Sequence, residues 1–586
     1  MSLFFKTTFI VVCASLMSIT CFAQGLRDLK ISEIMYHPLD EGGISSSDLE
    51  FLELKNTGNE ILNLKGVSIS EAISFSFEED YFLLPDSFSV IVSDSNSFHI
   101  RYPNVSVAGQ YSGKLANSGE HIVLAALSDV IINFEYSDDL PWPVLADGSG
   151  FSLVPISDSS ELEQGKADYW RNSSVINGSP GSDDDQPLLA YSDLWVNELL
   201  SHTDLPQLDA VEFFNAEEDT IDISNWYLSD SKSDVFKYKF PSNSKIAPGE
   251  FLVVDESDFN VGERGFRFNR SGDGVYLFSS NEHDELTGYS TGWKFDAQFN
   301  GVSFGRYTNG QGMNHFVSLK DVTLGSSNSE PRVGPLAIVN IMYNPDYLNE
   351  EYLIIQNTTD SVLSLFHINT PDSSWKITGI DFTFPINTSL KAGEKVIITS
   401  MEPSNFRTKY DLNDSIQVFK YSGQISNSGE DISLWWFDRI DTTATGKTFM
   451  PKVLIELVEY DDASPWPEAA DGYGHCLVRK DLRKYANDYQ NWDSSPDFPF
   501  YSSWSTRFLE GNFMNYRVLN GFLYVDNPNN LSGELRIYSS SGKLVTRLDV
   551  TDTKTVLSLQ EYANGVFYCS FRATNYHESY SFVVAK

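Results

Sequence analysis

The stretch YSDDLPWPVLADGSGFSLV at 136–154 returns as YDDASPWPEAADGYGHCLV at 460–478. Both copies hold Pro-Trp-Pro, then Ala-Asp-Gly, then a short apolar run. Two further pairs occur in the same order: LANSGEHIVL at 115–124 with ISNSGEDISL at 425–434, and ISEIMYHP at 31–38 with IVNIMYNP at 338–345. Because the order is kept, the repeated unit is a whole domain rather than a single motif.

A weaker copy lies between these two. It opens at VNELL (196–200) and holds NRSGDGVYLF at 269–278. The Ser-Gly pairs of the three copies begin at Ser118, Ser271 and Ser428, so the copies are about 155 residues apart. Polar stretches that contain proline separate the copies, at 179–187 and 325–335, which is typical of linkers.

Short strand-like runs fill each copy. EFLEL at 50–54 alternates with a period near two, and KVII at 395–398 is a β-branched run after a turn signal. The sequence holds no strong helical stripe with caps. The pattern therefore predicts an all-β protein of tandem β-sandwiches.

Length and charge limit the classes of protein. A chain of 586 residues predicts about four domains. With 41 basic and 81 acidic residues, the net charge is −40, which argues against a grip on nucleic acid or an anionic membrane surface. The 40 Phe, 29 Tyr and 11 Trp residues exclude a disordered acidic tail.

The first 23 residues are typical of a secretory signal peptide. Lys6 precedes an apolar run, and small residues end it, so we expect cleavage between Ala23 and Gln24. We expect no transmembrane helix in the mature chain, because no later apolar run approaches 18 residues. The mature chain would keep only Cys476 and Cys569, in different domains, and so no disulfide framework.

The repeated unit resembles the lamin tail domain, an immunoglobulin-like β-sandwich. The resemblance covers about residues 28–495. The matching motifs of the first copy are Glu33-Ile34-Met35-Tyr36-x-Pro38, Glu50-Phe51-Leu52-Glu53-Leu54-x-Asn56, Asn117-Ser118-Gly119-Glu120, Pro141-Trp142-Pro143 and Ala146-Asp147-Gly148. The third copy departs at Ile354, where the first two have Glu53 and Glu212, and the middle copy lacks Pro-Trp-Pro.

The last 70 residues resemble the C-terminal sorting domain of type IX secretion cargo from Bacteroidetes-type bacteria. The matching motifs are Asn527-Pro528-Asn529, Leu535-Arg536-Ile537-Tyr538, Asn564-Gly565-Val566-Phe567-Tyr568 and the ending Phe582-Val583-Val584-Ala585-Lys586. The resemblance implies export in two steps, with the type IX machinery as a partner. We therefore expect a signal peptide at 1–23, lamin tail domains at 24–182, 190–326 and 336–497, a linker at 498–515 and a sorting domain at 516–586.

No pattern in the sequence assembles an active site, so we predict no catalytic or cofactor-binding residue. Gly301-Val302-Ser303-Phe304-Gly305 fits the form of a nucleophile elbow, but a turn follows it where the elbow needs a helix. No spacing of His or Cys fits zinc. Asp147 and Asp471 could offer oxygen atoms to calcium, but Asp-Gly more often makes a tight turn.

Trp142 and Trp466 are the candidate ligand contacts. Flanking prolines would hold each ring rigidly against a sugar or a peptide. The alternative is that each ring plugs one end of a sandwich core, and we favour it.

The sequence thus predicts an exported, non-enzymatic protein of the cell surface or extracellular space, with an adhesion, scaffolding or binding role. Its partner would be an unidentified surface protein or glycan, and not nucleic acid. Two alternatives stay open: an accessory subunit of a secreted hydrolase, and an array of carbohydrate-binding modules.

Overall fold

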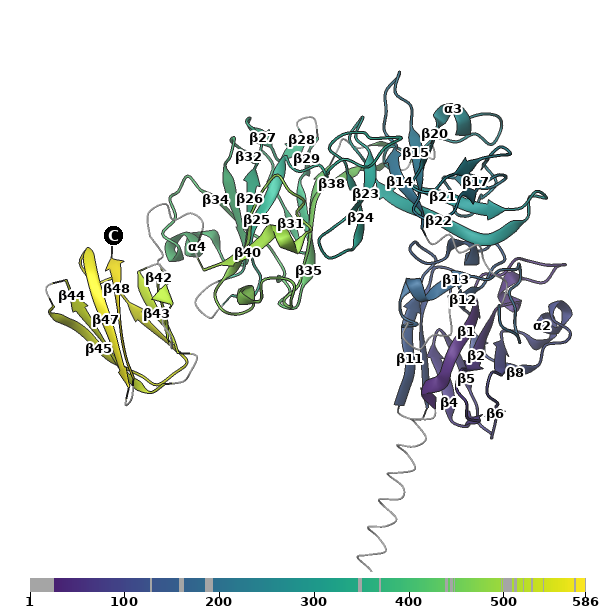
Figure 1. The fold of residues 1–586 in the computed structure, drawn as a ribbon, viewed down its shortest axis with the longest axis horizontal. Helices are drawn as coiled ribbons and strands as arrows, with labels where there is room; N and C mark the ends of the chain where they lie inside the picture. Colours follow the sequence, from purple (N-terminus) through teal and green to yellow (C-terminus); the bar gives the residue numbers. More distant parts are fainter. Residues whose placement is uncertain are drawn as a thin grey trace, which may run out of the picture. The chain divides into compact units, whose positions relative to one another are not determined.

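The computed structural model of the chain consists mainly of β-strands, with a few short helices (Figure 1). The prediction of an all-β fold of tandem immunoglobulin-like β-sandwiches is confirmed. The structure describes residues 26–584 except 127–128, 157–162, 185–192, 346–349, 368–369, 438–440, 443–445, 447, 497, 499–508, 511–513, 520, 528–530, 541 and 574–575. Ala23, Gln24, Pro528 and Asn529 lie outside the described residues.

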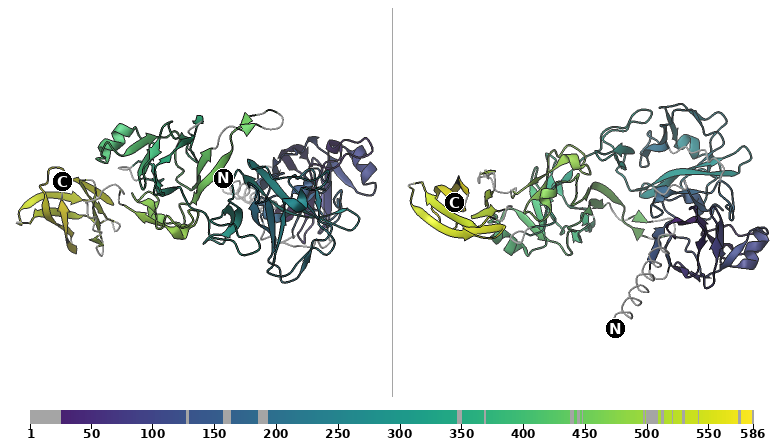
Figure 2. Two further views of the ribbon diagram at one scale, coloured as in Figure 1. Left: turned by 90° about the horizontal axis from the view of Figure 1, so that it is seen from above. Right: turned by 60° about the horizontal axis from the view of Figure 1, so that its bottom comes forward.

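The described residues form two compact units. The first holds residues up to 307 together with 314–332 and 451–453, and the second holds 308–313, 333–450 and the residues from 454 onward. Each unit contains two sandwiches, and their sheets can be followed from two further directions in Figure 2. None of the helices in the described part of the chain is long and apolar enough to cross a membrane.

The first sandwich packs a six-stranded sheet on a five-stranded sheet. The first sheet has the order β13 (Trp170–Asn172), β12 (Leu153–Pro155), β1 (Leu29–Met35), β2 (Phe51–Asn56), β7 (Phe88–Val92), β8 (Val107–Gln110). The second has the order β11 (Asp129–Tyr136), β10 (Glu120–Ala126), β4 (Val67–Glu71), β5 (Ile73–Ser76), β9 (Ser112–Gly113). A two-stranded pair, β3 (Leu62–Asn63) with β6 (Phe82–Leu83), lies at one edge.

The second sandwich has a five-stranded and a four-stranded sheet. Their orders are β20 (Phe251–Asp255), β15 (Ala210–Asn215), β14 (Leu194–Leu200), β23 (Phe304–Thr308), β24 (Asn314–Ser318), and β18 (Tyr238–Lys239), β17 (Tyr227–Ser229), β21 (Gly272–Ser280), β22 (Leu286–Asp296). A short pair joins β16 (Ile221–Asp222) to β19 (Lys245–Ile246).

The third sandwich has the same order of strands in its larger sheet as the first. That sheet runs β34 (Gln417–Lys420), β33 (Lys395–Thr399), β26 (Tyr352–Asn357), β25 (Leu336–Met342), β39 (Cys476–Arg479), β40 (Trp492–Ser495). The smaller sheet runs β31 (Phe382–Thr383), β30 (Lys376–Thr378), β35 (Glu430–Phe437), β38 (Lys452–Tyr460). Three short pairs complete it: β27 (Leu363–Ser364) with β32 (Ser389–Leu390), β28 (Phe366–His367) with β29 (Thr370–Ser374), and β36 (Asp441–Thr442) with β37 (Thr448–Phe449).

The C-terminal sandwich, drawn in yellow in Figure 1, has two four-stranded sheets. They run β41 (Leu509–Glu510), β42 (Asn515–Leu519), β43 (Phe522–Asp526), β46 (Lys554–Ser558), and β45 (Leu544–Val550), β44 (Gly533–Ser539), β47 (Gly565–Ala573), β48 (Tyr576–Val584). β41 lies within the segment that the sequence suggests is a linker, as does Phe498, which packs in the third sandwich.

Short helices that the sequence does not predict cover the outer face of the larger sheets. In the first sandwich, α2 (Ser95–Arg101) begins where the Asp94 side chain accepts a hydrogen bond from the Ser97 N–H, and its Phe98 packs on Phe51. In the third, α4 (Pro403–Lys409) begins with proline at its first turn. This cover explains why all of β2 is buried, although its alternating sequence predicts one exposed face. A single helical turn, α3 (Glu256–Phe259), has a capping box.

The opening strand pairs share one irregularity. β1 and β2 slip register by a bulge between Ile31 and Glu33, which places Glu33 opposite Glu53. The same bulge in β14 places Glu198 opposite Glu212, and in β25 it places Asn340 opposite Ile354. In each of the three sandwiches, the bulge therefore places two side chains of neighbouring strands directly opposite each other.

In each sandwich, one asparagine side chain joins two backbone segments by hydrogen bonds. The buried amide of Asn56 donates to the carbonyls of Glu60 and Leu83, at 2.8 and 3.0 Å. Asn215, Asn357 and Asn527 make the corresponding pairs of bonds in the other three sandwiches. Each amide thus satisfies backbone carbonyls that a strand end leaves unpaired.

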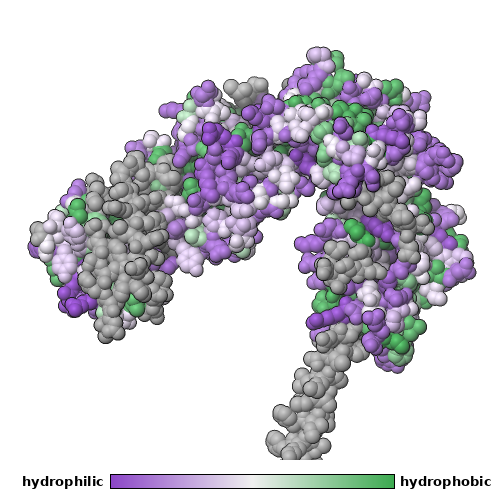
Figure 3. All heavy atoms as spheres, in the orientation of Figure 1, coloured by the Kyte–Doolittle hydropathy of each residue, from purple (hydrophilic) through white to green (hydrophobic). Residues whose placement is uncertain are grey.

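Hydrophilic residues cover most of the described surface seen in Figure 3, with hydrophobic residues scattered between them. This matches the net charge of −40.

Candidate functional site

The predicted ligand tryptophans lie in the cores. Trp142 is 8 % exposed and is flanked by Phe134 and Trp170, each with its ring centroid 6.4 Å away. Trp466 is 3 % exposed and lies 6.2 Å from Trp492. Both rings therefore contribute to core packing. Trp142 also lines a pocket, so a ligand contact stays a prediction for it as well as for Trp466.

The loop that contains Trp142, residues 140–151, forms a joint with the second sandwich. It includes the single turn η3 (Val144–Ala146), in which Val144 and Leu145 are fully buried. Together with Phe151 they form one apolar cluster with side chains of the second sandwich: Tyr227, Val235, Tyr276 and Phe278. Val144 and Leu145, which lie between Pro-Trp-Pro and Ala-Asp-Gly, thus make the contact between the two sandwiches.

A lysine of the second sandwich binds the acidic groups of this loop. Lys232 Nζ lies 3.0 Å from Asp147 and 3.5 Å from Asp139, and it donates a short hydrogen bond to Asp138. Burial by itself would lower the pKa of Lys232, but Asp138 and Asp147 outweigh it and raise that pKa. Lys294 adds a second pair with Asp139 at 2.6 Å. Asp147, one of the two residues considered for calcium, is therefore paired with an amine.

Asp147 also organises its own sandwich. Its carboxylate lies 2.6 Å from His37 Nδ1. Burial would raise the pKa of Asp147, yet hydrogen bonds from His37 and Lys232 hold it below its ordinary value. In the third sandwich Asp471 instead accepts a hydrogen bond from the Asn344 amide, at 2.5 Å. Among the residues that the structure describes, no group of three His, Cys, Asp or Glu side chains could hold a metal ion.

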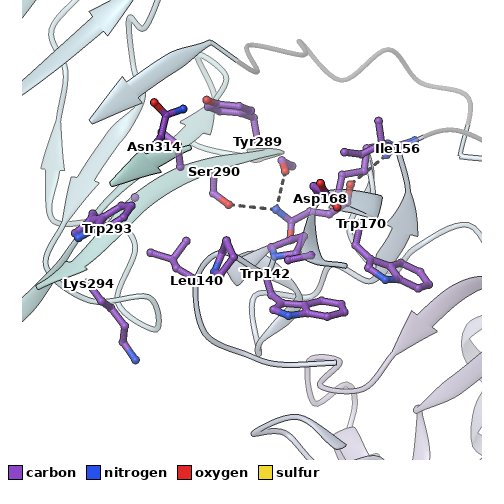
Figure 4. A pocket seen from close by; sticks show the side chains of 18 of the residues that line it. Leu140, Trp142, Ile156, Asp168, Trp170, Tyr289, Ser290, Trp293, Lys294 and Asn314 are labelled. Atoms are coloured by element: carbon purple, nitrogen blue, oxygen red, sulfur yellow. Dashed lines mark hydrogen bonds between the residues drawn. The ribbon is translucent and has the colours of Figure 1, made fainter. Parts of the chain in front are cut away.

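A pocket of about 660 Å³ lies beside the joint, between loops of the first sandwich and β22 (Figure 4). Leu140, Trp142 and Trp170 line one side, and Tyr289, Ser290 and Trp293 line the other. In Figure 4 the rings of Trp142 and Trp170 point away from β22, into the first sandwich. The Asn172 amide closes the floor by donating to Gly288 O and Ser290 Oγ, at 3.0 and 3.2 Å.

In the first two sandwiches, the paired carboxylates on the outer face hold the chain that leaves the sandwich. Glu33 accepts hydrogen bonds from Ser152 Oγ and the Ser179 N–H, and Glu53 accepts one from the Gly181 N–H at 2.6 Å. Burial raises the pKa of Glu33 well above its ordinary value, and repulsion from Glu53 adds to this. Burial also raises the pKa of Glu53 to about 7.

The second sandwich repeats this arrangement. Glu198 accepts from Ser303 Oγ at 2.6 Å and from Thr323, and Glu212 accepts from the Asn197 amide and the Gly325 N–H. Burial raises the pKa of Glu212 to about 7. Ser303, the central residue of the elbow-like motif, is thus fully buried and bonded to a structural carboxylate.

In the third sandwich, Asn340 and Ile354 occupy the positions of the two carboxylates. The Asn340 amide lies 3.5 Å from Cys476 Sγ, and Ile354 packs in an apolar cluster with Tyr352 and Phe498. Cys476 and Cys569 are both buried, each in a different sandwich.

Sequence reasoning identified the loop motif but not the residues that complete the joint and the pocket. Lys232 and Arg306 come from a copy that lacks Pro-Trp-Pro, so no repeated motif marks them. The departure at Ile354 was the one signal that pointed to the paired carboxylates.

A family model described as Lamin Tail Domain matches residues 188–308, which is the middle, divergent copy. That part of the chain is therefore similar to lamin tail domains, as its sequence predicts. No curated protein matches the chain.

Three of the solved structures that are similar to this chain come from Bacteroides or Porphyromonas species. A DUF3244 family protein with an immunoglobulin-like β-sandwich fold, from Bacteroides vulgatus, is 13 % identical, with 14 % of this chain and 96 % of that chain covered and a TM-score of 0.13. A DUF4876 family protein from Bacteroides thetaiotaomicron is 12 % identical, with 38 % and 90 % covered and a TM-score of 0.18. PorZ, a surface component of the type-IX secretion system of Porphyromonas gingivalis, is 10 % identical, with 95 % and 82 % covered and a TM-score of 0.14.

Proposed function

We propose that this chain is an exported, non-enzymatic protein of the cell surface or extracellular space that binds or scaffolds other surface components. The observation that carries this proposal is the joint. The end loop of the first sandwich is buried against the second, so the two sandwiches present their remaining loops as one body. Such a body suits adhesion and scaffolding, which depend on fixed spacing between binding surfaces.

In this proposal three lamin tail domains occupy 24–182, 190–326 and 336–497. The family match at 188–308 supports the second directly. The shared bulge and cross-strand pair in β1, β14 and β25 support extending it to the other two, because a bulge at one position of one strand pair is a feature that related domains keep.

The C-terminal sandwich, 516–586, would be the sorting domain that addresses the chain to type IX secretion. Two four-stranded sheets over these residues support a separate folded module. A chain lacking 516–586 should accumulate in the periplasm, measured by fractionation and surface labelling of the producing bacterium. The matched control is the full chain with Val261→Ser, an exposed position in the second sandwich, which should reach the surface. Normal surface delivery of the shortened chain would refute the sorting role.

The binding role has its own test. Crosslinking on intact cells, followed by capture of the chain, should recover a defined surface partner. A panel of hydrolase substrates, with and without calcium or zinc, should show no turnover by the purified chain. Metal-dependent turnover that persists through purification would overturn the non-enzymatic proposal.

A further inference from the structure

Arg306 of β23 is a half-buried cation that has no carboxylate partner among the residues described by the structure. Its guanidinium carbon lies 4.8 Å from the centre of the Trp195 ring, which offers only the negative face of an indole. Within the described part of the chain no carboxylate pairs with it, and its buried Nε has no hydrogen-bond acceptor. Burial lowers the pKa of Arg306, and the nearby Tyr289 opposes this only in part.

Arg306 lines the pocket beside the joint. Two other cations line it, but Arg171 pairs with Asp184 at 3.0 Å and Lys294 pairs with Asp139 at 2.6 Å. Of the three, Arg306 is therefore the one whose charge is left for a ligand. In a chain of net charge −40, a partly desolvated guanidinium that no described carboxylate neutralises is an unusual feature to retain without a use.

The rest of the pocket suits a flat, mainly apolar body. Tyr289 and Trp293 of β22 line it from the second sandwich, where their rings also pack against the core, and Leu140 lines it from the first. Ser290 and Thr291 of the same strand add two hydroxyls to the lining. Its volume of about 660 Å³ lies within the usual range for small-molecule sites, which is about 300–1,000 Å³. Apolar walls with a few polar groups fix the orientation of a ligand by those groups.

We propose that this pocket binds a ring that carries a carboxylate, with the carboxylate on Arg306 and the ring between β22 and the loop at Leu140. A planar guanidinium matches a carboxylate with two parallel hydrogen bonds, which a lysine cannot do. Two sources share this chemistry, a hexuronate sugar and an aryl acid. This inference goes beyond the proposed surface role and does not depend on export.

The test is a calorimetric titration of the full chain with two acids and their neutral counterparts. The probes are digalacturonate with galactobiose, and biphenyl-4-carboxylate with biphenyl-4-carboxamide. At least one acid should bind at least tenfold more tightly than its neutral counterpart. Binding by digalacturonate alone identifies the ligand as an acidic sugar, and binding by the aryl acid alone identifies an aryl carboxylate.

Two variants of Arg306 and one control complete the test. Arg306→Gln should abolish the preference for the acid, and Arg306→Lys should keep the preference while weakening binding several-fold, because it keeps the charge and loses the fork. Arg332→Gln is the matched control, since Arg332 is exposed and stacks on Phe299 at 5.3 Å outside the pocket. Arg332→Gln should bind as the unchanged chain does.

Three outcomes would overturn the proposal. They are no binding of either acid at millimolar concentration, equal binding of an acid and its neutral counterpart, and an unchanged preference in Arg306→Gln. The melting temperature of Arg306→Gln should equal or exceed that of the unchanged chain, because the substitution removes an uncompensated charge. A folded Arg306→Lys protein keeps the test valid if the Gln variant does not fold.

Discussion

The loops at 140–151 and 464–475 share a motif and are used differently. Both hold Pro-Trp-Pro and Ala-Asp-Gly, and in both the tryptophan is buried in its own core. In the first loop Val144 and Leu145 lie under the second sandwich, whereas the corresponding Glu468 and Ala469 are exposed. The motif therefore builds the end of the sandwich, and the residues between its fixed positions decide what that end contacts.

The acids of the two loops show the same difference. Asp138 and Asp147 are bound by Lys232, and their counterparts Asp462 and Asp471 have no amine partner within the described residues. The pKa of Asp462 is raised, first by desolvation and then by its interactions with Asp461 and Asp471. A partner sandwich thus neutralises one loop and leaves the other acidic.

The largest effect should come from converting the first loop into the third. Val144→Glu with Leu145→Ala removes a buried leucine side chain and buries a charge in the joint. Truncating a buried Leu costs about 2–5 kcal/mol, and an unpaired buried charge adds to this. We expect a fall of at least about 4 kcal/mol in the stability of the joint. Hydrogen exchange of β21 should accelerate, since Tyr276 and Phe278 lose their cover.

The reverse change is its control. Glu468→Val with Ala469→Leu places apolar side chains on an exposed loop, so unfolding should shift by less than about 0.5 kcal/mol. Gel filtration should instead show self-association. Unchanged exchange of β21 in the first variant would contradict the view that these residues make the joint.

A second comparison sets the paired carboxylates against Ile354. Glu53 has a folded pKa of about 7 against 4.5 when unfolded, so the folded state keeps a proton that the unfolded state releases. Stability should therefore fall as pH rises from about 4.5 to 7. Glu53→Gln should flatten this dependence and add on the order of 1–3 kcal/mol at pH 8, measured by denaturant unfolding.

Ile354→Glu should do the opposite in the third sandwich. It would bury a carboxylate beside Asn340 and destabilise that sandwich more at pH 8 than at pH 5, because protonation relieves the cost of burial. Equal destabilisation at both pH values would show that shape, and not charge, distinguishes the two sites.

A smaller effect should follow from Lys232→Met. The half-buried Lys232 holds Asp138 and Asp147, so its removal should cost about 1–2 kcal/mol of joint stability, with weaker dependence on salt than the unchanged chain. Lys294→Met, which removes a more exposed amine, should cost less than about 1 kcal/mol. Equal losses in the two variants would indicate that Lys232 acts only through long-range charge.

The smallest effect should come from Tyr473→Ser, which gives the third loop the residue that the first has at Ser149. Tyr473 is 62 % exposed. Thermal unfolding should therefore change by less than about 0.5 kcal/mol. A larger loss would mean that Tyr473 is part of a buried contact.

The sequence predicts the β-sandwiches because repeats, turn signals and alternating strands act locally. It does not predict α2 or α4, because each is only seven residues long and has no extended apolar stripe. It also does not show that β2 is buried on both faces, since what covers the outer face comes from residues about 40 and 130 positions away in the chain. The tryptophans were found by motif, but their burial depends on Phe134, Trp170 and Trp492, which no motif connects to them.

The pocket could not be predicted for the same reason. Arg306 and Trp293 belong to one sandwich and Leu140 to another, so their meeting depends on the joint. The sequence holds one signal that the two loops differ: Val144 and Leu145 of the first loop are apolar, whereas the corresponding residues of the other loop are Glu468 and Ala469.

The paired carboxylates of the first sandwich affect how much binding free energy the joint needs in order to stay closed. Glu33 and Glu53 hold the chain through Ser179 and Gly181, and Arg171 pairs with Asp184, so these contacts hold the chain to the first sandwich as far as residue 184. Since β14 starts at Leu194, fewer than ten residues separate the partners. A tether of this length gives an effective concentration of order millimolar. Two separate sandwiches at micromolar concentration would rarely associate through such a contact if it were weak. Within one chain, the same weak contact would be formed most of the time.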